Sequence, residues 1–125
     1  MHENEISYAI RGAAFRVHTA LGPGLLESVY ETALVYELRN AGFNVKTQVG
    51  VPIAYEEIKM DHGFRMDLLV NDKVMVEIKS VDALHDVHHK QLLTYLKLSG
   101  KKLGLLINFN VSSLKKSISR IVNKL

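Results

Sequence analysis

The apolar positions of the first forty residues recur at helical spacing. They are three or four residues apart in one series, Ile6, Ile10, Ala13, Val17 and Leu21, which predicts a helix from about residue 4 to residue 20. Gly22-Pro23-Gly24 should end that helix, because glycine loosens the backbone and proline disfavours helical geometry in the residue before it. A second helix is expected from about residue 25 to residue 41, with Gly42 as its C-terminal cap.

The period changes to two from Val45 onward. Apolar and smaller or polar residues alternate from Val45 to Tyr55, which predicts a strand, and Pro52 indicates that this strand lies at a sheet edge or is about to end. Glu56-Glu57 should turn the chain into a second strand that leads through Gly63 to Asp67.

A central hairpin is predicted around the turn-prone pair Asn71-Asp72. If the turn has three residues, Val70 pairs with Val74, and Asp67 falls opposite Glu77. The other face is then entirely apolar and should cover a core: Met66, Leu68, Val70, Val74, Val76 and Ile78. A shift of one residue would bury Glu77 and Lys79 without partners, so the pattern favours this register.

The last third of the chain predicts a helix, a strand and a helix. Residues from about 84 to 99 read as a helix closed by Gly100, and the almost wholly apolar run from Leu103 to Phe109 reads as a strand covered on both faces. Ser112 can cap a last helix whose inner side carries Leu114, Ile118, Ile121 and Val122. The fold class is therefore α/β (α+β), with a mixed four-stranded sheet flanked by helices, because a strand–helix–strand crossover implies a parallel pair.

The composition excludes some classes of function but does not identify one. The chain has 125 residues, enough for one domain over residues 1–125, and no cysteine, which excludes disulfides, thiolate nucleophiles and cysteine-ligated zinc. No apolar run approaches the ~20 residues that span a bilayer, and the first residues do not form a signal peptide, so we expect a cytoplasmic protein without membrane contact. The net charge of +3 is compatible with nucleic acid but does not require it.

Asp67 and Glu77 are the candidate metal ligands. Directly opposed Cβ atoms in an antiparallel pair are about 4.5–5.5 Å apart, a span that one divalent cation can bridge with two carboxylates. Lys79 projects from the same face. The alternative is a surface hairpin on which the lysine offsets two nearby carboxylates and no chemistry takes place.

Four short motifs follow one another on these predicted elements. They are Gly24-Leu25-Leu26-Glu27-Ser28-Val29-Tyr30, Arg65-Met66-Asp67, Glu77-Ile78-Lys79 and Gln91-Leu92-Leu93-Thr94-Tyr95. With them the sequence resembles the PD-(D/E)XK nuclease superfamily, and more narrowly the small GxxExxY proteins placed in it. The resemblance implies a restriction-endonuclease-like α-β-β-β-α-β core with an extra N-terminal and an extra C-terminal helix. The proline that names the superfamily is replaced here by Arg65-Met66, but that proline carries no ligand.

The resemblance also implies a role for individual residues. Asp67, Glu77 and the Ile78 carbonyl would hold Mg²⁺, for which Mn²⁺ can substitute, and Glu27 would reach the ion through water. Lys79 would orient the attacking water or neutralise the transition state. Gln91 and Tyr95, four residues apart on one helical face, would position the metal site and the strand. Glu27 can instead simply favour the helix dipole, and Gln91 with Tyr95 can simply pack the helix on the sheet.

The function implied is a metal-dependent nuclease that hydrolyses phosphodiester bonds, with DNA as the expected substrate. The alternative is a catalytically silent module of the same fold that binds nucleic acid or a protein partner. A homodimer is compatible with so small a nuclease. His85, His88 and His89 could together bind zinc, but we expect them to be exposed side chains instead. Lys116, Arg120 and Lys124 form a basic stripe if the last helix exists.

Overall fold

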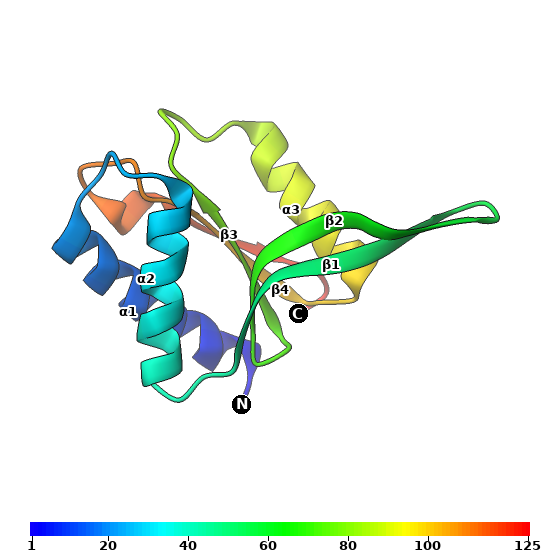
Figure 1. Cartoon of the computed structure of the whole chain (residues 1–125), viewed down its shortest axis with the longest axis horizontal. Helices are drawn as coiled ribbons and strands as arrows, with labels where there is room; N and C mark the ends of the chain where they lie inside the picture. Colours follow the sequence, from blue (N-terminus) through cyan, green and yellow to red (C-terminus); the bar gives the residue numbers. More distant parts are fainter.

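A five-stranded mixed sheet organises the chain in the computed structural model, which describes residues 1–125 (Figure 1). The elements in chain order are α1 (Glu3–Leu21), α2 (Glu27–Asn40), β1 (Val45–Tyr55), β2 (Ile58–Val70), β3 (Val74–Lys79), α3 (Asp86–Ser99), β4 (Leu103–Asn108), the 3₁₀ turn η1 (Leu114–Lys116) and β5 (Ile118–Val122). The strands lie in the order β1-β2-β3-β4-β5, and only the β3–β4 pair, joined through α3, is parallel. The predicted α+β class with a mixed sheet is confirmed.

Two apolar clusters separate the faces of the sheet. Helices α1 and α2 pack on one face, against alternate residues of β3 and β4 such as Val76 and Leu105. Helix α3 packs on the other face, where Leu92 and Leu96 contact Met75 and Leu106. Because β3 and β4 are covered on both sides, nearly all their residues are buried. The continuous apolar sequence predicts this for β4, whereas β3 was expected to cover a core with one face only.

Tyr30 fixes the loop between the first two helices. Its hydroxyl donates a hydrogen bond to the Gly22 carbonyl (2.6 Å) and accepts one from the Leu25 N–H (3.1 Å), while its ring stacks on Phe109 at a centroid distance of 4.5 Å. The loop therefore continues through Leu26, and α2 begins at Glu27 rather than at residue 25. Gly24, with φ of 92°, allows a backbone turn that other residues rarely adopt.

The expected C-terminal helix is wrong, and the sheet has five strands rather than four. Leu114 starts only a short 3₁₀ turn, after which Ile118–Val122 pair antiparallel with β4, so that Ile107 lies opposite Ile118. Without β5, the N–H and C=O groups on this side of the buried strand β4 would lack partners, which favours a strand here. Lys116, Arg120 and Lys124 consequently lie on a turn, a strand and the chain end, and they form no helical stripe.

The hairpin of β1 and β2 projects beyond the rest of the sheet (Figure 1). These two strands pair from Val45 opposite Val70 out to Tyr55 opposite Ile58, and β1 is an edge strand, as Pro52 indicated. In contrast, β2 pairs with β3 only over Leu68–Val70. The two strands of the central hairpin therefore diverge at the residue before Leu68.

Met66 does not share a face with Leu68, contrary to the simple alternation predicted for β2. Leu68 packs beneath α1 and α2, whereas Met66 packs with Phe64 in the cluster under α3. The change occurs where β2 leaves β3, and where Gln48 on the neighbouring strand has a left-handed backbone with φ of 50°. Such a local irregularity increases strand twist and redirects side chains.

Candidate active site

The predicted register of the central hairpin is confirmed. Val70 lies opposite Val74, and Leu68 lies opposite Val76. The next positions are Asp67 and Glu77, where the strands separate and the regular ladder stops. Here the Ile78 N–H donates to Asp67 Oδ2 at 2.9 Å, and the Asp67 N–H donates to Glu77 Oε1 at 3.4 Å. Both carboxylates thus lie at the opening between β2 and β3.

Glu77 is buried and Asp67 is half-buried, so both charges are costly without a partner. Glu77 is 8% exposed, and its pKa is raised to about 7, first by burial and then by the negative charge of Asp67. Burial also raises the pKa of Asp67, although the hydrogen bond from the Ile78 N–H opposes this. A nearby cation would stabilise the ionised forms of both carboxyl groups and so lower their pKa values.

Lys79 supplies part of that positive charge. It is half-buried at the end of β3, two residues beyond Glu77, and its charge lowers the pKa of both Glu77 and Asp67. The lowering is smaller than the effect of burial on each carboxyl group. The structure therefore brings these three residues together and leaves the pair short of positive charge.

Glu27 approaches the pair from the first turn of α2. Its Oε2 accepts a hydrogen bond from the Ser80 N–H at 3.2 Å, and the Ser80 hydroxyl donates to the Leu25 carbonyl at 2.6 Å. Its negative charge contributes to the raised pKa of both Asp67 and Glu77. Glu27 is exposed, not on the buried face of its helix, and it lines a polar cavity of about 270 Å³ together with Asp67.

Tyr95 lies on α3, within electrostatic range of the acidic pair. Its ring stacks on Phe64 at a centroid distance of 3.8 Å, so the residue packs α3 on the projecting part of β2. Burial raises the pKa of Tyr95, and the charges of Glu77 and Asp67 raise it further, while the exposed Gln91 side chain lowers it. Tyr95 thus contributes to packing and also lies within electrostatic range of the site.

Sequence reasoning missed two residues of this region, Gln48 and Glu31. The Gln48 amide donates to Glu31 Oε1 at 2.8 Å and, more weakly, to Asp67 Oδ1 at 3.5 Å. Burial raises the pKa of Glu31, the Gln48 hydrogen bond opposes this, and the charge of Asp67 adds to the rise. Glu31 could have been found from the sequence, since it follows Glu27 by four residues and so lies on the same side of α2.

The donor set suits a hard divalent ion with few protein ligands. No group of three or more His, Asp and Glu side chains is arranged to hold a metal. Mg²⁺, however, commonly binds through only one or two carboxylates and keeps several waters. Asp67 and Glu77, with a backbone carbonyl such as that of Ile78, fit this requirement, because their oxygens are hard ligands and their pair lacks positive charge.

The histidines of α3 do not form the alternative metal face. The His85 N–H donates to His88 Nδ1 at 3.0 Å, so His88 serves the start of the helix. His89 Nε2 instead lies 3.0 Å from the Ser119 hydroxyl on β5. His85 is exposed as expected, whereas His88 and His89 are half-buried.

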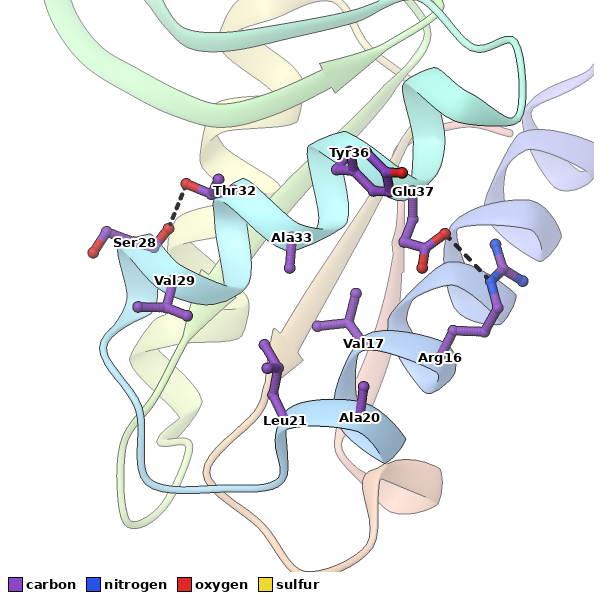
Figure 2. Close-up of a pocket in the computed structure, with 10 residues that line it drawn as sticks. All are labelled: Arg16, Val17, Ala20, Leu21, Ser28, Val29, Thr32, Ala33, Tyr36 and Glu37. Atoms are coloured by element: carbon purple, nitrogen blue, oxygen red, sulfur yellow. Dashed lines mark hydrogen bonds and ion pairs between the residues drawn. The ribbon is translucent and has the colours of Figure 1, made fainter.

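A larger cavity than the polar one lies elsewhere, between α1 and α2. It has a volume of about 680 Å³ and is lined mainly by apolar side chains, including Val17, Leu21 and Val29 (Figure 2). An ion pair between Arg16 and Glu37, 3.7 Å apart, borders it. None of the predicted site residues lines this cavity.

A family model described as the PD-(D/E)XK nuclease superfamily matches residues 4–121, which include every helix and strand except the ends of α1 and β5. No curated protein and no solved structure matches the chain. No helix is long and apolar enough to cross a membrane.

Proposed function

The chain belongs to the PD-(D/E)XK nuclease superfamily, and from this premise we propose that it hydrolyses phosphodiester bonds, with DNA as substrate. The observation that carries the proposal is the meeting of Asp67 and Glu77 where β2 and β3 diverge, with Lys79 beside them. Buried carboxylates short of positive charge, on the elements that carry the four motifs, support a hydrolytic site rather than a surface ion pair.

Nucleases of this superfamily generally use divalent metal ions, and we propose Mg²⁺, replaceable by Mn²⁺. Asp67, Glu77 and the Ile78 carbonyl would hold the ion, with Glu27 contributing through water. When bound, such an ion supplies charge stabilisation at the phosphate and acidifies a coordinated water. The raised pKa values of Asp67 and Glu77 mean that the ion binds in competition with protons.

Lys79 is the proposed catalytic amine. Its ammonium group would donate hydrogen bonds to the attacking water or to a non-bridging phosphate oxygen, where negative charge develops. The water oxygen forms a bond to phosphorus, the bond to one ester oxygen breaks, and the proton of the water passes through solvent to that leaving oxygen. Gln91 and Tyr95 would hold α3 and the projecting part of β2 in place beside this reaction.

Cleavage of defined DNA tests the proposal. Purified protein is incubated with linear double-stranded and single-stranded DNA in Mg²⁺ or Mn²⁺, beside the Glu77→Ala and Lys79→Ala variants and a sample with chelator. We expect cleavage by the wild type that both substitutions and the chelator abolish. Two results would refute the assignment. One is no cleavage by the wild type, and the other is cleavage that Glu77→Ala and Lys79→Ala leave unchanged, as a contaminating nuclease would produce.

A silent module of the same fold is the second candidate, and one observation favours it. Asp67, Glu77 and Glu27 each accept a hydrogen bond from a backbone N–H, so the arrangement is held together by the protein itself. Such a module would bind DNA with an affinity that falls steeply with salt and does not change with Mn²⁺. A role confined to protein partners would show neither DNA affinity nor cleavage.

We also propose a homodimer in which the projecting hairpin takes part. Tyr55 and Ile58 at its tip are 67% and 61% exposed, and Met60 beside them is 41% exposed, although large apolar side chains usually find cover. Sedimentation of the wild type and of a Tyr55→Ser/Ile58→Ser variant tests this: the variant should be monomeric. A monomeric wild type would contradict it.

A cytoplasmic location completes the proposal. The 125 residues include no cysteine, which fits a reducing compartment where disulfides are not used. Fluorescence microscopy of the tagged protein in its own cells tests the location, and a signal confined to another compartment would contradict it.

A further inference from the structure

Gln48 has an unusual backbone at a position that faces the site. Thr47 lies opposite Leu68 and Val49 lies opposite Met66, so Gln48 falls opposite Asp67, yet no regular pairing forms there. Its φ of 50° is in the left-handed region, which non-glycine residues seldom adopt. Strained residues of this kind persist only where the surrounding structure requires them, and they gather at functional sites.

The Gln48 side chain contacts two carboxylates of the site. Its amide nitrogen donates to Glu31 Oε1 at 2.8 Å and lies 3.5 Å from Asp67 Oδ1. The other Asp67 oxygen, Oδ2, accepts the Ile78 N–H at 2.9 Å. Asp67 is therefore held from both sides, by a backbone donor of β3 and by an amide of β1.

Glu31 completes this arrangement from α2. It forms no ion pair with a lysine or arginine, and the Gln48 amide is its one hydrogen-bond partner. A neutral amide between two carboxylates gives each an N–H donor without adding a charge that would compete with a metal ion. All three residues line the polar cavity of about 270 Å³ that also contains Glu27.

We propose that Gln48 is a positioning residue for Asp67, and that Glu31 anchors the Gln48 amide in the required orientation. This inference rests on the proposed function, since it assigns Gln48 to the orientation of a ligand for the divalent ion. Partners of metal ligands act in this way elsewhere: their loss commonly weakens metal affinity by about 10–100-fold. Gln48 touches Asp67 and not the reacting atoms, so it is not itself catalytic.

A purely structural role makes a different prediction. In that case the contact from Gln48 to Glu31 would only join β1 to α2, and its loss would lower stability while leaving metal affinity alone. The two roles are separated by measuring the unfolding midpoint in urea and the Mn²⁺ dissociation constant on the same variants.

Gln48→Gly is the decisive substitution. Glycine adopts a φ of 50° freely, so the backbone is preserved while the amide is lost. Thr47→Gly is the matched control, because it adds the same flexibility one residue earlier, at an exposed position. Gln48→Asn is a second test, since asparagine also tolerates this backbone but its amide is one carbon too short to reach both carboxylates.

Calorimetric titration of the full chain with Mn²⁺ alone gives the result. We expect Gln48→Gly to weaken Mn²⁺ binding about tenfold, Gln48→Asn to weaken it less, and Thr47→Gly to leave it unchanged. The urea midpoint of Gln48→Gly should not fall below that of Thr47→Gly, because glycine relieves the left-handed backbone at residue 48. Wild-type Mn²⁺ affinity in Gln48→Gly, or an equal loss of Mn²⁺ affinity in Thr47→Gly, would overturn this inference and leave the proposed function standing. If the wild type bound no Mn²⁺, the proposed function would fail, and this inference with it.

Discussion

Asp67 and Glu77 occupy opposite strands at the point where β2 and β3 separate, and the backbone N–H of Asp67 donates to the Glu77 carboxylate. The Asp67 carboxylate in turn accepts the N–H of Ile78, the residue after Glu77. Side-chain oxygens thus take the place of carbonyl groups that a continued ladder would have provided. The two carboxylates therefore meet because β2 and β3 separate at this point.

Replacing Glu77 with glutamine should stabilise the metal-free protein at high pH. Because the folded pKa of about 7 lies above the ordinary glutamate pKa of 4.5, the protonated Glu77 stabilises the fold fully below pH 4.5, and this contribution is lost as pH rises through 7. At pH 8 the wild type should be less stable than Glu77→Gln by up to about 3 kcal/mol, whereas at pH 4.5 the two should differ little. Urea unfolding in chelator at both pH values measures this.

Glu57→Gln is the control for that comparison, since Glu57 is exposed in the turn of the projecting hairpin. A stability change that appears in Glu77→Gln and not in Glu57→Gln belongs to the buried position and not to the loss of a carboxyl group in general. An equal stability difference between the wild type and Glu77→Gln at the two pH values would show that the carboxyl group is not perturbed by burial.

Metal affinity should rise with pH up to about pH 7. Ionised Glu77 is the form that can bind a cation, and at lower pH the raised pKa keeps this group protonated in the folded protein. Mn²⁺ titrations at pH 6 and pH 8 should therefore show tighter binding at pH 8. Repeating them in buffers of different ionisation enthalpy should reveal proton release at pH 6. Equal affinity at both pH values would mean that Glu77 is not a ligand.

Lys79→Ala should separate binding from catalysis. The ammonium group is expected to act on the attacking water or the transition state, so its loss should lower the rate of cleavage by roughly a hundredfold or more. Mn²⁺ binding should be retained or strengthened, because a positive charge next to the two carboxylates has been removed. A variant that lost metal binding along with activity would place Lys79 in a structural role.

Tyr30→Phe tests whether the Tyr30 hydroxyl holds the loop before α2 in place. The variant keeps the stacking on Phe109 but loses the hydrogen bonds to Gly22 and Leu25, so it should be about 1 kcal/mol less stable. Tyr36→Phe, at an exposed position of the same helix, should be neutral in urea unfolding. Equal midpoints for the two variants would mean that the Tyr30 hydroxyl does not hold the loop.

The central hairpin could be predicted because two independent signals agree on it. A three-residue turn at residues 71–73 places Val70 opposite Val74, and the apolar face expected for the two strands favours the same register. The identity of the site residues on β2 and β3 is a consequence of this register. The position of Glu27 was less determined, since it depends on how the Gly22-Pro23-Gly24 loop returns to the end of β3.

The C-terminal segment and Gln48 could not be predicted in the same way. Ile118, Ile121 and Val122 are too few to distinguish a helical period from a strand, and the open edge of β4 decided the outcome. Gln48 stands at an ordinary polar position of an alternating strand, and nothing in its residue type indicates a left-handed backbone. Its contacts with Glu31 and Asp67 depend on the packing of three separate elements.

Anomalous diffraction from crystals soaked with Mn²⁺ would locate the ion that we propose between β2 and β3. We expect one strong anomalous peak there, with oxygens of both Asp67 and Glu77 as its protein ligands, and its loss in Asp67→Ala crystals. A strong peak at the histidines of α3, or no peak while both carboxylates are well ordered, would contradict the proposal.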